Sequence, residues 1–356
     1  MKERIEYFDL AKGFCIILVV LMHLDHHIHL NHQIACFLQS FRMPLYFLLS
    51  GLFINTSYNS LDFFIKKTNK LLIPFVFFFL LTSCLLPFIL DITLNVNIKL
   101  YNGWHTLYAF IFPCQYPNYP IWFLWVLFLS NMTYFIFNKI LNKFHINSNE
   151  SYYLFMISLC FSFLYHLYIT NTDILMPFHI DRLIIYMPFF CFGAIIKNFL
   201  LSIDRYTLRN KIIFVLLFGI ICNILSHYVI IEKNHLCIYI ICFIISGISG
   251  SIMIISLSSI FKRIPIISFY GRYSIIILVS HEIVISFTDR LLYSRFNSFG
   301  YIDLVLVLFV LASQYPIILL FKKYIPWFVA QENIIGNEEN MNKQRRNEIF
   351  HQTHGN

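Results

Sequence analysis

Long apolar segments alternate with short polar segments along most of the chain. A run of about 17 to 25 predominantly apolar residues is long enough to cross a bilayer as a helix. The pattern predicts an all-α fold class, a polytopic integral membrane helical bundle with about ten transmembrane helices. The predicted spans lie near residues 8–26, 34–56, 70–90, 119–138, 152–170, 182–200, 211–231, 236–260, 272–292 and 301–322.

The pattern changes after the last predicted span. Residues 331–356 are rich in Asn, Glu, Gln and Arg and contain few apolar positions. A segment of this composition cannot bury enough apolar surface to fold on its own. The sequence therefore predicts two parts, a transmembrane domain over residues 1–325 and a polar, disordered tail over residues 326–356.

The composition is that of a membrane protein. Hydrophobic residues make up 58% of the chain and charged residues 12%, whereas soluble domains carry about 25% charged residues. The aromatic share of 19% is typical of lipid-facing surfaces and interfacial belts. The net charge of +8 is better explained as an orientation signal than as a nucleic-acid surface, so we expect no nucleic-acid partner.

Lysine and arginine residues are distributed unevenly between the two sides of the predicted bundle. Cytoplasmic loops of membrane proteins carry an excess of these residues. Twenty of the 26 lie on the side of the N-terminus. The other six are Arg42, Lys99, Arg182, Lys233, Arg290 and Arg295. This bias predicts that both termini are cytoplasmic, because ten spans return the chain to the side on which it began.

The first predicted span carries three ionisable residues, Asp9, Lys12 and His23. Such groups are costly inside a membrane and mark candidate functional sites. Lys12 and His23 are eleven residues apart, nearly three helical turns, so they share one face at a separation of roughly 16 Å. This alignment on one helix face predicts a site that begins at a cytoplasmic cation and extends inward to a histidine. In the alternative interpretation, Asp9 and Lys12 form a surface pair and His23 is a satisfied interior residue.

Two later spans also carry ionisable groups. Arg42 lies in the second apolar segment, where a guanidinium needs a polar partner or an anionic ligand. His281 and Glu282 lie in the ninth span, about 12 to 15 Å inward from its cytoplasmic end. The presence of both His23 and His281 in one apolar protein favours a shared polar cavity.

The segment that begins at His23 raises the question of a metal. Residues 23–32 contain five histidines and Asp25, and these side chains are suitable zinc ligands. The run has no recognised metal-binding spacing such as HExxH, so we expect no metal. His23 is the member of the run that we select as functional.

Four segments in a fixed order carry a family resemblance. Residues 9–23, DLAKGFCIILVVLMH, resemble the opening helix of the membrane-bound acyltransferase-3 family, the O-acyltransferases that modify bacterial surface glycans. Residues 41–51, 121–124 and 269–281 resemble later family segments in the same order. The resemblance covers residues 1–325, and the ordered set is far more specific than any single segment.

The resemblance implies roles for particular residues. Family members carry a basic residue followed, after ten intervening residues, by a histidine thought to be essential, which here corresponds to Lys12 and His23. A second basic pair on a cytoplasmic loop corresponds to Lys67 and Lys70. Both pairs have Lys where Arg is frequent in the family, and Lys is seen in the fucose-4-O-acetylase-like branch. The change removes the guanidinium fork from the expected phosphate site.

The reaction that the resemblance implies is transfer of an acyl group, usually acetyl, from cytoplasmic acyl-coenzyme A to a sugar hydroxyl. The acceptor would be a cell-surface polysaccharide or a lipid-linked glycan, and the location the bacterial cytoplasmic (inner) membrane. Lys12, Lys67 and Lys70 would bind the phosphates of acetyl-coenzyme A. His23 would act as the general base toward the acceptor hydroxyl.

Three further residues also have places in this scheme. Asp9 is too far from His23 to orient it, so we expect Asp9 to position Lys12. Arg42 or His281 would stabilise the oxyanion or orient the acceptor. The sequence does not choose between these two roles.

Two other functions fit the same pattern. A proton-coupled transporter or flippase of a polysaccharide export pathway would also have ten spans with His, Arg and Glu inside the membrane. A non-catalytic membrane subunit of polysaccharide-synthesis machinery is the third alternative. The ordered family segments favour the enzyme.

Overall fold

The structure is a computed structural model that describes residues 5–24, 30–85, 108, 110–112, 118–144, 150–168, 176–231, 236–293 and 300–336. Over these residues every regular element is a helix, which confirms the all-α class there. The α-helices are α1 (Glu6–His23), α3 (His32–Leu52), α4 (Ser60–Lys67), α5 (Ile73–Leu80), α8 (Trp122–Lys143), α9 (Glu150–Tyr168), α10 (Ile180–Ile195), α11 (Lys197–Ser202), α12 (Leu208–Ile231), α13 (Leu236–Phe261), α14 (Pro265–Arg272), α15 (Ser274–Tyr293) and α16 (Gly300–Tyr324). The short helices are η1 (Thr68–Leu72), η2 (Leu81–Leu85), η3 (Tyr119–Ile121), η4 (Pro177–His179), η5 (Ile203–Arg205) and η6 (Pro326–Val329).

Each of the ten predicted spans overlaps a helical stretch. Among the described residues, six stretches are long and apolar enough to cross a membrane. They are Ser60–Leu85, Tyr119–Lys143, Pro177–Ile195, Leu208–Tyr228, Ile238–Phe261 and Val305–Tyr324. The protein is therefore a multi-pass helical membrane protein, and the total of about ten transmembrane helices stays a prediction.

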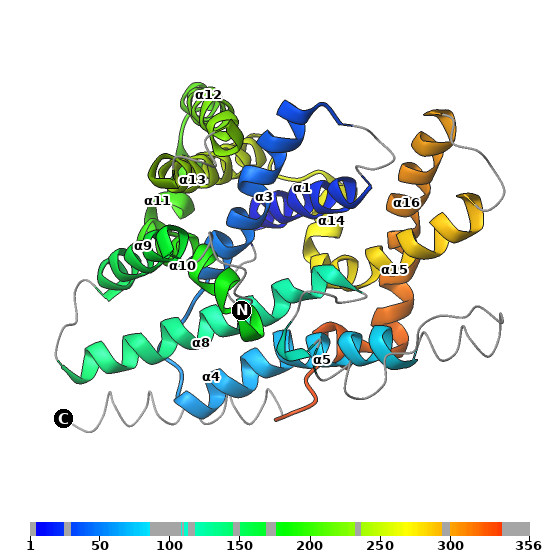
Figure 1. The fold of residues 1–356 in the computed structure, drawn as a ribbon, viewed down its shortest axis with the longest axis horizontal. Coiled ribbons are helices and arrows are strands. Elements are labelled where there is room, and N and C mark those ends of the chain that lie inside the picture. Colours follow the sequence, from blue (N-terminus) through cyan, green and yellow to red (C-terminus); the bar gives the residue numbers. More distant parts are fainter. Residues whose placement is uncertain are drawn as a thin grey trace.

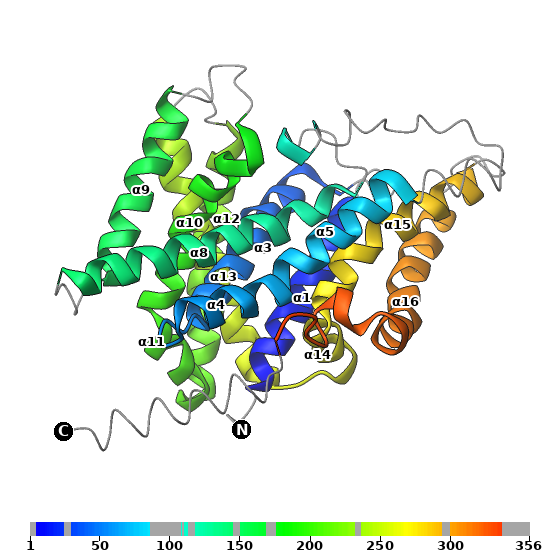
Figure 2. The same cartoon turned by 90° about the horizontal axis from the view of Figure 1, so that it is seen from below.

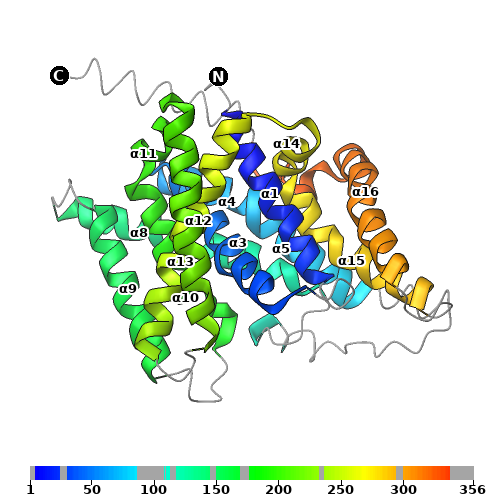
Figure 3. The same ribbon diagram turned by 90° about the horizontal axis from the view of Figure 1, so that it is seen from above.

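Helices α1 and α3 lie at the centre of the assembly (Figure 1). Helix α1 packs against α3, α13, α14 and α15, and α3 also packs against α10. Helices α9, α10, α12 and α13 lie on one side of this central pair, and α14 to α16 lie on the other (Figure 3). Helix α8 and the α4–α5 stretch run side by side across one face (Figure 2).

The outer helices present apolar side chains outward. On α12, Leu216 and Ile220 are 59% and 58% exposed, and Leu308 on α16 is 58% exposed. Large exposed apolar surfaces are unfavourable in water but favourable against lipid tails. Four of the residues predicted to be functional, Asp9, Lys12, His23 and Arg42, lie instead on the central helices α1 and α3.

Two close helix crossings require glycine. A Cβ atom on Gly51 of α3 would lie 1.8 Å from the carbonyl oxygen of Phe190 on α10. A Cβ atom on Gly271 of α14 would lie 1.7 Å from the carbonyl oxygen of Asp9 on α1. Small residues let membrane helices approach closely, so these two glycines set the positions of α3 and α1.

A π-helical turn, η1, joins α4 to α5. Pro74 follows it, and a proline ring clashes with the carbonyl of the residue four positions earlier, here Lys70. Widening the turn from α to π relieves that clash, and π-turns of this kind often mark functional sites. Lys70 is therefore held on an irregular turn rather than on a regular helix.

Residues 326–336, which we name the strap, pack back onto this turn. Asn69 Nδ2 donates to the Ile335 carbonyl at 2.8 Å, and the Ile334 and Ile335 N–H groups donate to Asn69 Oδ1 at 2.9 and 3.0 Å. The Phe328 ring stacks on Phe77 of α5 at a centroid distance of 4.0 Å. The predicted tail thus begins with residues that contact the helices, and residues 337–356 lie outside the described part of the chain.

Candidate active site

Helix α1 lines two cavities, and the predicted site residues are divided between them except for His281, which is in the lining of neither. The first, which we name the cation cavity, has a volume of about 450 Å³. Its charged lining residues are Asp9, Lys12, Lys67, Lys70 and Arg272. Four cations and one carboxylate around one cavity are suited to an anionic ligand with several charges.

Aromatic rings lie beside two of these cations. Lys12 Nζ is 5.4 Å from the centroid of the Phe53 ring, and Lys67 Nζ is 5.4 Å from that of Phe63. Ring faces attract cations without neutralising them. The two rings therefore help to position the ammonium groups at the cavity wall.

Asp9 contacts a residue that the sequence did not connect with it. Its Oδ2 atom lies 3.9 Å from Arg272 Nε on α14. Asp9 is buried, and Arg272 lines the cation cavity. Asp9 therefore helps to position Arg272 at the cavity. That Asp9 also positions Lys12 stays a prediction.

The strap contributes to the wall of the cation cavity. Ala330 and Gln331 line it, together with Lys70 of η1. Because Asn69 of the same π-turn holds the strap, the position of Lys70 and the position of the strap depend on each other. Sequence reasoning missed this contribution, because the polar composition of the segment predicted no packing.

The second cavity, which we name the histidine cavity, has a volume of about 310 Å³. His23 lines it at the last turn of α1, with Arg42 of α3 and Arg182 of α10. Its aromatic residues are Tyr119, Trp122, Tyr186, Tyr239 and Phe243. The cavity thus combines a histidine, two guanidinium groups and five aromatic rings.

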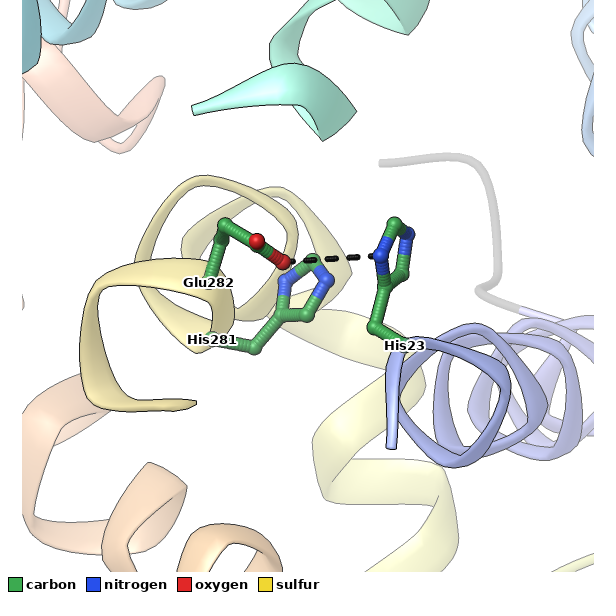
Figure 4. Close-up of side chains that lie close together, drawn as sticks. All are labelled: His23, His281 and Glu282. Atoms are coloured by element: carbon green, nitrogen blue, oxygen red, sulfur yellow. Dashed lines mark ion pairs between the residues drawn. The ribbon is translucent and has the colours of Figure 1, made fainter. Parts of the chain in front are cut away.

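His23 is held by two residues of α15 (Figure 4). Its Nδ1 atom lies 3.4 Å from Glu282 Oε2, and its ring centroid lies 5.1 Å from that of His281. A carboxylate accepts hydrogen bonds, so this contact favours the tautomer in which Nδ1 carries the proton. His23 Nε2 is then the basic atom.

His281 has a different environment from His23. It is fully buried, and its Nδ1 donates to the Ile277 carbonyl at 2.8 Å. Its Nε2 atom has no hydrogen-bond partner among the described residues. With Nδ1 as the donor, the neutral ring has an acceptor and no donor at Nε2, which disfavours His281 as the oxyanion donor and leaves Arg42 for that role.

The same three side chains also have the composition of a metal site. One ligand atom each from His23, His281 and Glu282 lie within 4.8 Å of one another. Zinc ligands at about 2.1 Å from one ion lie roughly 3.4 Å apart, so the set would have to contract to hold zinc. Asp25, His26, His27 and His29 of the histidine-rich run lie outside the described residues, and the absence of a metal stays a prediction.

The two cavities share their walls. Helices α1, α3, α8 and α15 each contribute residues to both. Tyr46, which lines the cation cavity, donates its hydroxyl to the Lys12 carbonyl at 3.1 Å, and Cys15 donates to the Arg42 carbonyl at 2.7 Å. These bonds fix α1 to α3, so the positions of Lys12 and His23 are set by the same pair of helices.

Comparison with known families gives an assignment. A family model described as an acyltransferase domain, that of acyltransferase-3, matches residues 5–322. The chain belongs to the acyltransferase-3 family. Searches among curated proteins and among solved structures returned no match.

Membership of the acyltransferase-3 family establishes this chain as a membrane acyltransferase. The matched residues include both cavities except for the strap. The fucose-4-O-acetylase-like branch and the glycan specificity stay predictions.

The structure divides the predicted site residues, apart from His281, into two groups, and His281 contacts His23 without being in the lining of either cavity. Lys12, Lys67 and Lys70 line the cation cavity, whereas His23 and Arg42 line the histidine cavity. Arg182 and Arg272 join these groups from α10 and α14, and the sequence signal for them was only their unusual place within or beside apolar segments. Glu282 was visible as a neighbour of His281, but nothing in the spacing indicated that it contacts His23.

Proposed function

We propose that this acyltransferase moves an acyl group, usually acetyl, from cytoplasmic acyl-coenzyme A to a sugar hydroxyl of a cell-surface polysaccharide or lipid-linked glycan. The protein would work in the bacterial cytoplasmic membrane with both termini in the cytoplasm. The cation cavity would bind the donor, and the histidine cavity would bind the acceptor.

One observation carries the proposal. Helix α1 presents Lys12 to a cavity with four cations and His23 to a second cavity with aromatic and arginine residues. A donor with a pyrophosphate and a 3′-phosphate needs several cations at one end. Its thioester must reach a base at the other, and a single helix that lines both cavities supplies that geometry.

The chemistry follows from the positions of the side chains. His23 Nε2 takes the proton of the acceptor hydroxyl while the hydroxyl oxygen attacks the thioester carbonyl. Glu282 orients the ring through Nδ1 and stabilises the positive charge that forms on it. Arg42 stabilises the oxyanion of the tetrahedral intermediate. The carbon–sulfur bond then breaks, and the protonated His23 returns the proton to the departing thiolate.

The experiment uses membranes that contain the full chain and radiolabelled acetyl-coenzyme A. His23→Ala is expected to lower label transfer to glycan by at least about 100-fold, because a general base contributes roughly 10²–10⁴ to the rate. His227→Ala, an exposed histidine on α12, is the matched control and keeps the wild-type rate. Wild-type transfer by His23→Ala at equal protein abundance would show that His23 is not the base.

The same preparation separates the enzyme from a transporter or flippase. Sealed vesicles receive labelled acetyl-coenzyme A on the side of the membrane opposite to the glycan. The proposed enzyme consumes the donor in proportion to glycan modification. A carrier would instead move glycan across the membrane at a rate independent of the donor concentration.

A further inference from the structure

Arg182 gives the histidine cavity a second cation that the acyl transfer itself does not require. Base and oxyanion donor are supplied by His23 and Arg42, which come from α1 and α3. Arg182 comes from the first turn of α10 and lines the same cavity. Arg182 therefore needs a separate role on the acceptor side of the site.

Three neighbours hold the Arg182 side chain in place. Its Nη2 donates to the Tyr119 hydroxyl at 2.5 Å, and its guanidinium carbon lies 4.7 Å from the centroid of the Trp122 ring. Its Nε lies 3.7 Å from Asp181 Oδ2, which is longer than a hydrogen bond. A guanidinium has five N–H donors, so Arg182 is positioned and retains donors for a ligand.

The rings around Arg182 are themselves held. Tyr186 stacks on Phe47 at 4.8 Å and on Trp122 at 5.7 Å between centroids. Asn118, next to Tyr119, donates to the Val279 carbonyl of α15 at 2.8 Å. Rigid aromatic faces with a few polar groups are suited to a flat, hydroxylated ligand such as a sugar ring.

The charged lining residues of the cavity are cationic. Arg42 and Arg182 line it, and its described lining residues include no carboxylate. Asp181 pairs with Arg182 only at 3.7 Å, beyond hydrogen-bond distance. A fixed guanidinium binds carboxylate and phosphate groups through paired hydrogen bonds. A neutral sugar would gain little from this arrangement.

From this arrangement we propose that the acceptor is an anionic saccharide whose carboxylate or phosphate group binds Arg182 while its reacting hydroxyl lies at His23. The inference rests on the proposed function, because it names the substrate class of the same site. The negative group comes either from a sugar acid within the glycan or from the pyrophosphate of a lipid-linked glycan. Arg182 is then the residue that selects the acceptor, and Arg42 stays at the reacting end.

The test measures binding without donor, using the full chain in lipid nanodiscs and titration calorimetry. The probes are chitotetraose, which is neutral, a hyaluronan tetrasaccharide, which carries carboxylates, and a short-chain lipid pyrophosphoryl-N-acetylglucosamine. At least one anionic probe is expected to bind about tenfold or more tightly than chitotetraose. Preference for the tetrasaccharide assigns a sugar acid, and preference for the lipid probe assigns a pyrophosphate.

Two variants connect the preference to Arg182. Arg182→Gln is expected to weaken the preferred anionic probe about tenfold and to leave chitotetraose unchanged, whereas Arg182→Lys keeps part of the preference. Lys139→Gln removes an exposed cation elsewhere on the protein and leaves all binding unchanged. Equal thermal midpoints of the three variants exclude unfolding as the cause.

Several results overturn the inference. They are equal binding of neutral and anionic probes, no binding of any probe at millimolar concentration, and an unchanged preference in Arg182→Gln. The variant His23→Ala tests the proposed function separately. If it loses acyl transfer but still prefers the anionic probe, both proposals are supported. If it transfers at the wild-type rate and still prefers the anionic probe, His23 is not the base but the acceptor class stands.

Discussion

Glu282 Oε2 lies 3.4 Å from His23 Nδ1, although the two residues belong to helices at opposite ends of the chain. The contact connects the last turn of α1 to α15 and favours Nδ1 as the protonated nitrogen of His23. Glu282 is only partly exposed, at 24% of its side chain, so solvent screens the contact weakly. The pair therefore places a carboxylate beside the histidine that we propose as the general base.

The first prediction concerns Glu282 as a positioning residue. Glu282→Gln is expected to lower kcat about 10- to 100-fold, because the amide keeps an acceptor for Nδ1 but no longer stabilises the imidazolium. Glu282→Ala should lower kcat further, since it also removes the acceptor. KM for acetyl-coenzyme A should stay unchanged in both variants. Steady-state kinetics in membranes measure the two parameters.

Glu332→Gln is the control for this comparison, because Glu332 is an exposed carboxylate on the strap and does not line either cavity. It should keep the wild-type kcat. An equal rise in KM and fall in kcat for Glu282→Gln would indicate a general structural disturbance instead of a role in orienting His23.

Local spacing explains why part of the site was predictable. Helical periodicity places Lys12 and His23 on one helix at a fixed separation, and both residues do lie on α1 and line cavities. Apolar length predicted the helices, since each predicted span overlaps one. These inferences need only residues close together in the sequence.

Contacts between distant helices were not predictable in the same way. The pairs His23–Glu282 and Asp9–Arg272 depend on how α1 packs against α15 and α14, which glycines such as Gly271 permit. Residue spacing within one helix does not predict how distant helices pack against each other. The strap was missed for a related reason, because backbone hydrogen bonds to the single side chain of Asn69 hold it, and composition does not report such bonds.

The second prediction compares two adjacent lysines. Lys67 lines the cation cavity, whereas Lys66 does not, and Lys66 Nζ donates to the Tyr58 hydroxyl at 2.6 Å. Lys67→Gln is expected to raise KM for acetyl-coenzyme A about tenfold, equivalent to about 1.4 kcal/mol, with little change in kcat. Lys66→Gln should leave KM near its wild-type value. Donor titrations in membranes check both values.

The salt dependence of KM gives an independent reading of the same site. Phosphate binding by several cations weakens as ionic strength rises, so the wild-type KM should increase with salt. The increase should be smaller in Lys67→Gln because one charge contact is gone. Identical salt dependence in the two proteins would argue against a phosphate contact at Lys67.

The third prediction concerns metal removal. His23, His281 and Glu282 have ligand atoms within 4.8 Å of one another, yet the set is wider than a zinc site. Dialysis of the protein in nanodiscs against a chelator is therefore expected to leave acetyl transfer unchanged. Elemental analysis should find far less than one metal ion per chain. Loss of transfer that is restored by adding zinc would mean that the three residues form a metal centre.

The fourth prediction concerns Asn69, which is 1% exposed and holds the strap through three hydrogen bonds. Asn69→Ala removes the hydrogen-bond partner of the Ile334 and Ile335 backbone groups, at a cost of about 0.5–1.5 kcal/mol per lost hydrogen bond. Because Ala330 and Gln331 of the strap line the cation cavity, KM for acetyl-coenzyme A should rise several-fold while kcat is retained. Hydrogen exchange should become faster at the Ile334 and Ile335 amides. Asn142→Ala, an exposed asparagine on α8, should change neither quantity, and faster exchange with an unchanged KM would separate the strap from donor binding.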